Sequence, residues 1–182
     1  MRSAARTVHI TPEEYLAAEA VAELRHEYVD GAVVAMVGAS LPHVRIVRNL
    51  VQRLDPRLKR PCELLFTDAL VRVEAANAYY YPDAVVTCAG AGGDQRIVAE
   101  PLLIIEVLSE TTAHRDRSEK RRNYQRIPSV RAVLLIDQSR RQVELDRRDP
   151  DGGWTRETLT DEGSLDLPGL DVTLDLDDIY AG

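Results

Sequence analysis

Two carboxylates stand in apolar runs of this sequence and constrain its fold more than any other feature. The segment PLLIIEVLSE, residues 101–110, reads as a buried strand except for Glu106. Asp83 stands at the entrance of a second apolar run, in YYYPDAVV, residues 79–86. An unpaired buried carboxylate costs several kcal/mol, which is on the order of the whole stability of a small domain. Both side chains therefore need a partner in the folded protein, and a metal ion is one candidate.

The spacing within each run indicates how the two carboxylates can meet. Alternate residues of a strand share a face, so Asp83 is grouped with Val85, and Glu106 with Ile104 and Leu108. If the two strands are neighbours, both carboxylates converge at one end of a sheet. Hard divalent cations prefer carboxylate oxygens and keep several waters, so two carboxylates and a backbone carbonyl suffice as ligands. The pattern predicts a site for Mg²⁺ (or Mn²⁺), an ion that can polarise a phosphoryl oxygen.

Composition indicates a soluble globular protein. The chain has 182 residues, enough for one domain with a substantial core, with 45% apolar and 29% charged residues. No apolar run approaches about 18 residues and the N-terminal residues lack an apolar core, so we expect neither a membrane span nor a secretory signal. Cys62 and Cys88 are isolated and lack CxxC spacing. They predict free core thiols in a reducing compartment, the cytoplasm.

Local signals predict the first elements of the fold. Thr11 and Glu14 form a capping box that opens a helix. Asp30-Gly31 is typical of a two-residue turn between the arms of a hairpin. Ser40 caps a second helix, over residues 41–59. The core stripe of that helix is expected from apolar residues at helical spacing, which are Val44, Val47, Val51, Leu54 and Leu58.

The later segments complete a mixed α/β pattern. CELLFTDALVRVEA, YPDAVVTCAG and PLLIIEVLS read as strands, and a third helix is expected over residues 113–127. RAVLLIDQ and a more polar hairpin follow. The order of helices and strands predicts one α/β domain over residues 1–182, built around one sheet, with residues 1–10 as a loose segment.

Basic residues concentrate in two segments although the net charge is −7. Residues 45–60 hold six and residues 115–131 hold seven of the 23 Lys and Arg residues. Such segments can meet a phosphate backbone, although solvated helix faces explain them equally well. The helix over 113–127 is polar on all sides apart from Tyr124, which is typical of a weakly attached helix or one turned toward a ligand. The candidate phosphate contacts are Arg45, Arg48, Arg115, Arg117, Arg121 and Arg122.

Four blocks of the sequence resemble one known family. Pro82-Asp83 followed by Glu106-Val107-Leu108 is similar to the motif of the PD-(D/E)XK nuclease superfamily. HEYVDGAVVAMVGAS, YYYPDAVV, LLIIEVLSETT and DRSEKRRNYQRIPSV, in this order, resemble the Uma-two family of restriction endonucleases from about Thr11 to the end of the chain. The resemblance implies a restriction-endonuclease-like fold, with a central mixed sheet flanked by helices, and metal-dependent hydrolysis of DNA phosphodiester bonds. It also implies Asp83, Glu106 and the Val107 carbonyl as metal ligands, and a homodimer.

One position departs from the motif. The motif's lysine normally follows the glutamate by two residues, where this chain has Leu108. We expect Lys120 to replace it, because related families are thought to move the lysine to the following helix. The chain has 21 arginines and only two lysines. A lysine among arginines is notable because its pKa can shift whereas that of arginine cannot. Glu27 matches the family's N-terminal acidic position, where it would orient a metal-bound water or join a second ion; an exposed hairpin residue is the alternative.

Other interpretations stay open at this point. Asp83 could be a strand-entry residue bonded to backbone, and Glu106 could form an ion pair with Arg115 or Lys120. The chain could also be a catalytically inactive module that binds nucleic acid or a protein partner. A sugar hydrolase fits less well, since one Trp and one Phe offer few aromatic platforms. His26, His43 and His114 show no zinc-site spacing.

Overall fold

The computed structural model describes residues 9–36, 38–89 and 96–181. Its first elements are those predicted. Helix α1 (Pro12–Glu19) begins at a complete capping box, in which the Glu14 amide donates to Thr11 Oγ1 over 3.2 Å and the Thr11 amide to Glu14 Oε2 over 2.8 Å. Strands β1 (His26–Val29) and β2 (Ala32–Ala35) form the predicted hairpin. Asp30 and Gly31 both adopt positive φ, 44° and 91°, as a tight hairpin turn requires.

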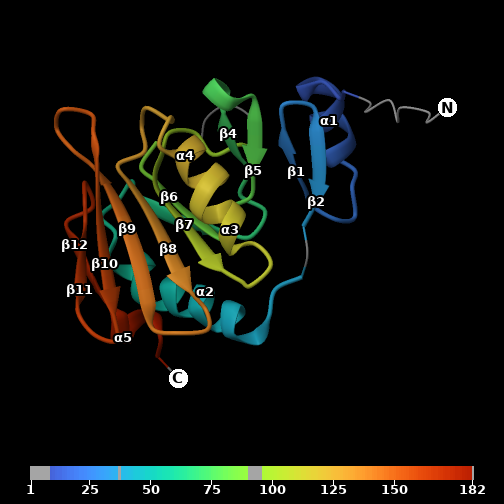
Figure 1. The fold of residues 1–182 in the computed structure, drawn as a ribbon. Coiled ribbons are helices and arrows are strands. Elements are labelled where there is room, and N and C mark those ends of the chain that lie inside the picture. The colour runs from blue at the N-terminus through green and yellow to red at the C-terminus, as the bar shows by residue number, and fades with distance from the viewer. Residues whose placement is uncertain (1–8, 37, 90–95, 182) are drawn as a thin grey trace.

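A six-stranded mixed sheet lies at the centre of the molecule (Figure 1). In spatial order its strands are β10 (Trp154–Thr160), β9 (Gln142–Arg148), β8 (Ala132–Asp137), β7 (Pro101–Leu108), β6 (Ala84–Thr87) and β3 (Glu63–Phe66). Strands β7 and β8 run parallel, and the other neighbouring pairs run antiparallel. A parallel pair needs a crossover, which the third predicted helix supplies. The prediction of a mixed α/β fold with a central mixed sheet is confirmed.

Two smaller sheets flank the central one. The hairpin pairs with β5 (Ala78–Tyr80), and β5 with β4 (Val71–Val73), in the order β2-β1-β5-β4. Near the C-terminus β11 (Ser164–Leu167) pairs with β12 (Val172–Asp175), and the short helix α5 (Leu176–Ile179) follows. Short 3-10 turns lie at Asp55–Arg57 and Glu74–Ala76. The hairpin and α1 stand to one side of the central sheet (Figure 1).

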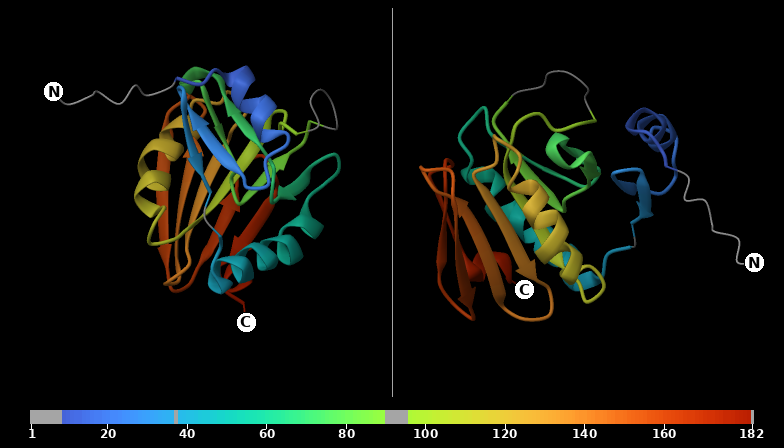
Figure 2. Two further views of the ribbon diagram at one scale, coloured as in Figure 1. Left: turned by 90° about the vertical axis from the view of Figure 1, so that its right-hand side faces the viewer. Right: turned by 45° about the horizontal axis from the view of Figure 1, so that its top comes forward.

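Two helical segments cover opposite faces of the central sheet (Figure 2). Helix α2 (Leu41–Arg53) packs on the face that carries Leu103, Ile105 and Val107 of β7. The crossover consists of α3 (Ala113–Arg115), a π-helical turn (Asp116–Lys120) and α4 (Arg121–Tyr124). Its Tyr124 packs with Ile104 and Leu108 on the other face. None of the helices in the described ranges is long and apolar enough to cross a membrane.

The predicted core stripe of α2 is confirmed in part, since Leu54 is buried and Val47, Val51 and Leu58 pack against the core, but Val44 does not belong to it. The helix begins after Ser40 as expected, but its buried residues are Ile46, Asn49 and Leu50. Val44 is 51% exposed. Val44, Val47 and Val51 line an apolar groove of about 540 Å³ beside the C-terminal half of β3. Asn49 is buried although it is polar, because its side-chain amide donates to the carbonyls of Ile179 and Ala181 over 2.9 and 2.8 Å.

The prediction of two free thiols is also wrong. Cys62 and Cys88 form a disulfide. The antiparallel register of β3 and β6 pairs Glu63 with Thr87, so the next residues outward are the two cysteines. Sequence spacing alone could not show this pairing because it depends on which strands are neighbours. The thiol argument for a cytoplasmic location is therefore removed, and that location stays a prediction.

Candidate active site

Asp83 and Glu106 lie at the same end of the sheet because their strands are antiparallel neighbours. Ala84 of β6 pairs with Ile105 of β7, and one further step along the ladder brings Asp83 to Glu106. The Val107 amide donates to Asp83 Oδ2 over 2.6 Å, which fixes the carboxylate against β7. The adjacency expected from strand alternation is therefore present, and the backbone contact considered for Asp83 is present with it.

Lys120 reaches this point from the crossover. Its Nζ lies 3.0 Å from Glu106 Oε1, 2.7 Å from Glu27 Oε1 and 3.6 Å from Asp116 Oδ1. The lysine is 6% exposed. One turn later, the Tyr124 hydroxyl donates to the same Glu106 Oε1 over 2.6 Å. The five-residue π-helical turn that ends at Lys120 is a feature found often at functional sites.

Glu27 is part of the same cluster. It is 3% exposed, so the alternative of an exposed hairpin residue is wrong. Its Oε2 accepts from Arg115 over 2.6 Å, and its Oε1 faces Lys120 and the Tyr81 amide. The hairpin thus contributes a carboxylate that pairs with both Lys120 and Arg115 of the crossover.

The electrostatics of the cluster are unbalanced. The carboxylates of Glu27, Glu106 and Asp116 lie against Lys120, and Glu27 also pairs with Arg115. The fourth carboxylate, Asp83, faces His43 instead. Burial raises the pKa of Glu106 to about 8, and the Asp83 and Asp116 carboxylates add to that rise, while Lys120 opposes it. Burial likewise raises the pKa of Asp116.

Burial and the neighbouring charges act in opposite directions on the pKa of Lys120. Burial alone lowers the pKa of Lys120, but the carboxylates of Glu106, Glu27 and Asp116 outweigh burial and raise it. The ammonium group is therefore charged at neutral pH. It offers three N–H donors, and its carboxylate partners hold it at the inner wall of the site.

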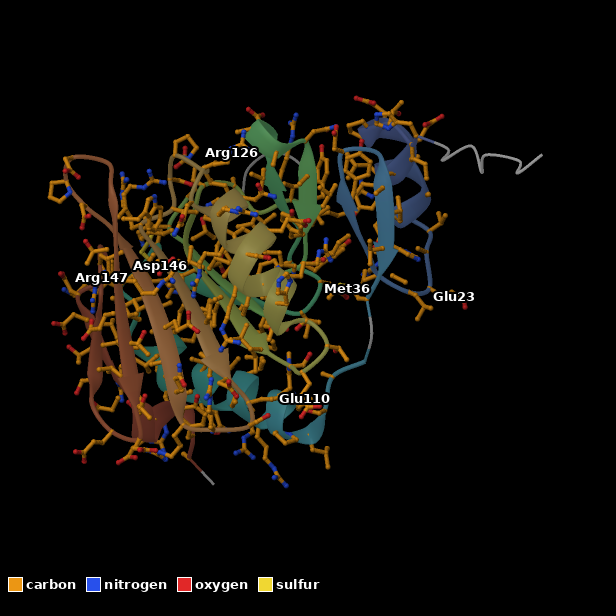
Figure 3. All side chains as sticks on the ribbon, in the orientation of Figure 1. Glu23, Met36, Glu110, Arg126, Asp146 and Arg147 are labelled. Carbon is orange, nitrogen blue, oxygen red and sulfur yellow. A yellow bond between two sulfur atoms is a disulfide. The ribbon has the colours of Figure 1, made fainter. Side chains whose placement is uncertain are left out.

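A cavity of about 640 Å³ opens over these residues. It lies between the hairpin, the ends of β6 and β7, the start of α2 and the crossover, and its lining includes Glu27, Asp83, Glu106, Arg115 and Lys120. Met36 and Glu110 also line it, and Figure 3 places Met36 at the end of β2 and Glu110 on the loop after β7. The size suits a small ligand or one portion of a polymer.

The donor set suits a hard divalent cation. Carboxylate oxygens of Asp83 and Glu106 and the Val107 carbonyl belong to the ligand class that Mg²⁺ and Mn²⁺ prefer. The excess of buried carboxylate charge favours a cation in this cavity. Within the described part of the chain, no three His, Cys, Asp or Glu side chains already converge as a metal cluster. A bound ion therefore has to compete with the present partners of Asp83 and Glu106.

The six predicted phosphate-contacting arginines have different surroundings. Arg115 lines the cavity, and Arg45, Arg48 and Arg122 are exposed. Arg121 is 4% exposed and pairs with Glu144 and, over 3.4 Å, with Asp146 of β9. Its assignment to a DNA-contacting surface is contradicted, since a buried and paired guanidinium does not reach a phosphate.

Arg117, like Arg121, pairs with Glu144 of β9. It donates to Glu144 Oε1 over 2.7 Å and is half-buried. Gln125 donates to Asp146 Oδ2 over 2.6 Å. The crossover, polar on most sides in sequence, is therefore attached to the sheet through ion pairs and hydrogen bonds in addition to the packing of Tyr124.

Two contributors to the site were not assigned from sequence. His43 Nε2 lies 2.9 Å from Asp83 Oδ1, and its side chain is 15% exposed. Tyr124, noted only as the apolar body of its helix, bonds Glu106. The spacing of Tyr124 four residues after Lys120 places both on one helix face and could have indicated a shared target. No spacing signal links His43 to Asp83, because α2 and β6 meet only in the fold.

Comparison with known proteins identifies the family and supports the fold. A solved structure described as "a putative nuclease belonging to DUF820" from Anabaena variabilis matches with a TM-score of 0.75 at 16% identity, over 94% of this chain and 98% of that one. Two uncharacterized proteins of Synechocystis sp. are related. The protein slr1290 is 30% identical over 95% of this chain and 92% of its own length, and sll1609 is 32% identical over 90% and 95%. The model of a family named Uma2, "Putative restriction endonuclease", matches residues 12–177. The chain therefore belongs to the Uma2 family.

Proposed function

We propose that this protein is an endonuclease that hydrolyses phosphodiester bonds of DNA with the help of Mg²⁺ or Mn²⁺. The observation that carries the proposal is the cluster in which Asp83 and Glu106 lie side by side and Lys120 bonds Glu106, at the wall of an open cavity. Buried carboxylates without full charge compensation are costly, and this cost is typical of a site built to bind a cation. The family description and the fold of the solved neighbour support the same class of activity.

Asp83, Glu106 and the Val107 carbonyl would hold the ion. When bound, the ion neutralises charge on the reacting phosphoryl group and lowers the pKa of a coordinated water. The chain's own contribution is to fix these donors. The Val107 amide holds Asp83, and the Tyr124 hydroxyl holds Glu106. Lys120 and Tyr124, the two hydrogen-bond donors to the Glu106 side chain within the described residues, both reach Oε1.

Lys120 acts as a hydrogen-bond donor and a positive charge in this proposal. Its raised pKa, caused by Glu106, Glu27 and Asp116 against the effect of burial, keeps it protonated, so it does not serve as the base that removes a proton from water. A buried ammonium beside the reacting phosphate stabilises the negative charge that develops in the transition state. Glu27 positions this ammonium through its 2.7 Å contact and does not need to touch the metal.

Arginines around the cavity would bind the DNA backbone. Arg115 stands at the cavity wall, and Arg45 and Arg48 follow along α2 from its opening. Arg122 adds a further exposed charge on α4. Each contact with a phosphate releases condensed counterions, so binding is expected to weaken steeply with salt. A homodimer, with one site for each strand, is the assembly we expect for double-strand cleavage.

The test is cleavage of closed circular DNA, which only an endonuclease can open. We expect nicking with Mg²⁺ or Mn²⁺ and none in the presence of EDTA. Asp83→Asn should reduce the rate to background. The matched control is Asp171→Asn, which alters an aspartate whose side chain is 81% exposed and which should cleave at the wild-type rate. Equal activity of the Asp83→Asn variant would refute the proposal.

One observation favours a second candidate function, a module that binds nucleic acid without cutting it. Asp83 and Glu106 already have partners within the protein, namely the Val107 amide, His43, Lys120 and Tyr124. Such internal pairing offsets part of the cost of burying the two carboxylates without a metal. This candidate predicts salt-dependent DNA binding that neither EDTA nor Asp83→Asn changes, together with no cleavage under any metal condition.

A further inference from the structure

We propose that His43 is a third protein ligand of the divalent ion, beside Asp83 and Glu106, and that it makes the site prefer Mn²⁺ to Mg²⁺. This inference rests on the proposed function, since it concerns the same metal site. It adds a residue that the sequence pattern did not assign, and it names the cofactor more narrowly.

The geometry of His43 and Asp83 is that of two neighbouring ligands. His43 Nε2 lies 2.9 Å from Asp83 Oδ1. Two donors about 2.1 Å from one ion and at right angles to each other are about 3.0 Å apart in an octahedral shell. The pair is therefore already spaced as one edge of such a shell. Because no three such side chains of the described residues already converge as a metal cluster, a shared ion has to replace this hydrogen bond and draw Glu106 toward the pair.

The Asp83 side chain and the backbone of His43 are held in place by hydrogen bonds. The Val107 amide occupies Asp83 Oδ2, so Oδ1 is the oxygen that faces His43. His43 belongs to the first turn of α2, where its amide donates to the capping Ser40 Oγ over 3.3 Å. Both residues line the cavity and are mostly buried, with side chains 15% and 18% exposed. Fixed donors of this kind lose little conformational entropy when they bind an ion.

The chemistry of an imidazole determines the preferred metal. Mg²⁺ favours oxygen donors and retains its waters, whereas a neutral imidazole nitrogen binds first-row transition ions more strongly. Among those ions Mn²⁺ is the one that also suits carboxylate and carbonyl oxygens. A site with His43, Asp83, Glu106 and the Val107 carbonyl therefore matches Mn²⁺ better than a site made of oxygens alone.

A purely structural role for His43 makes a different prediction. The imidazole could serve only to tie α2 to the start of β6 through Asp83. A glutamine at this position can still donate to Asp83 through its amide, but it supplies no imidazole nitrogen. His43→Gln therefore separates the two roles. His114→Gln is the matched control, because His114 is exposed on α3 and does not line the cavity.

The experiment is electron spin echo spectroscopy of Mn²⁺ bound to the intact protein, with Mn²⁺ and Mg²⁺ affinities measured by calorimetric titration. We expect coupling between Mn²⁺ and a directly bound nitrogen in the wild type and in His114→Gln, and its loss in His43→Gln. We also expect His43→Gln to weaken Mn²⁺ binding by about tenfold or more while Mg²⁺ binding changes far less.

Other outcomes would overturn either the role of His43 or the metal site itself. A wild-type protein that binds Mn²⁺ without nitrogen coupling, or a His43→Gln variant that keeps its preference for Mn²⁺, overturns the role of His43. If Asp83→Asn then abolishes Mn²⁺ binding, the proposed metal site survives without His43. A wild-type protein that binds neither ion overturns this inference and the proposed metal-dependent function together.

Discussion

Lys120 Nζ and Glu27 Oε1 lie 2.7 Å apart, and this ion pair joins the N-terminal hairpin to the crossover at the centre of the candidate site. The same carboxylate accepts a hydrogen bond from Arg115. Because Lys120 also bonds Glu106, the position of the lysine depends on two carboxylates from different sheets. The site therefore needs the hairpin in place, although the strands of the hairpin belong to a different sheet from Glu106.

Lys120→Arg should be nearly as inactive as Lys120→Ala. The guanidinium group is wider than an ammonium, and the 6% exposure of Lys120 leaves little room for it between Glu27 and Glu106. Loss of one donor to a developing oxyanion costs about 10²–10³ in rate, and we expect a loss of this size in single-turnover cleavage. Thermal unfolding must show that each variant is folded. Full activity of Lys120→Ala would show that the crossover lies outside the active site.

The pKa of Glu106 predicts how metal binding depends on pH. Since burial raises this pKa to about 8, the carboxyl group is protonated in much of the metal-free protein at neutral pH. A ligand must lose its proton, so Mn²⁺ affinity should rise with pH up to about 8 and then level off. Titration calorimetry in buffers of different ionisation enthalpy should detect a proton released on binding near neutral pH. Affinity that is constant across this range would contradict the assignment of Glu106.

The raised pKa of Glu106 also predicts how the stability of the metal-free protein changes with pH. In the unfolded chain Glu106 has its ordinary pKa of 4.5, whereas in the folded protein it is about 8. Between these values the folded state binds the proton and the unfolded state does not, so the free energy of unfolding falls as pH rises. We expect this decline in the metal-free wild type and a smaller one in Glu106→Gln. Chemical denaturation at several pH values measures the difference.

Asp83→Asn should abolish metal binding and leave the fold intact. The asparagine oxygen can still accept from the Val107 amide, and removal of the negative charge relieves repulsion with Glu106. The melting temperature should be unchanged or higher. A loss of several kcal/mol would instead indicate that Asp83 is mainly a structural partner of His43 and Val107.

Arg121 and Arg122 should respond differently to replacement although they are adjacent. Arg122 is exposed, and its replacement by alanine should reduce the slope of DNA affinity against salt by about 0.9 per lost phosphate contact, without affecting stability. Arg121→Ala breaks a buried ion pair with Glu144 and should cost about 3–5 kcal/mol in unfolding free energy. An unchanged salt slope for Arg122→Ala would remove that residue from the DNA contacts.

The regular elements could be predicted from sequence because they depend on local pattern, whereas the meeting of the two carboxylates needed the further assumption that their strands are neighbours. Capping at Thr11 and Ser40 and the Asp30-Gly31 turn are local signals, and each one marks an element that the structure contains. The convergence of Asp83 with Glu106 follows from strand alternation once the two strands are assumed to be neighbours.

Features that depend on tertiary pairing could not be predicted in this way. Arg121 was expected at a DNA surface because it belongs to the basic segment 115–131. Its partners, Glu144 and Asp146, lie on β9, and their contact with Arg121 depends on how the crossover packs on the sheet. The disulfide between Cys62 and Cys88 needed the register of β3 and β6.

The structure also gives a physical reason for the displaced lysine. Leu108, which occupies the motif's lysine position, is 2% exposed and packs with Ile104 and Tyr124. A lysine there would bury a charge in an apolar cluster. Lys120 approaches Glu106 from the crossover instead and finds further partners in Glu27 and Asp116.

The central claim is that Asp83 and Glu106 bind a divalent cation, and crystals grown with Mn²⁺ test it most directly. An anomalous difference map should show a peak within about 2.3 Å of oxygens from Asp83 and Glu106, close to the Val107 carbonyl. The same crystals of Asp83→Asn should lack the peak. A map of active protein with no peak between these residues, or with a peak elsewhere on the molecule, would contradict the account.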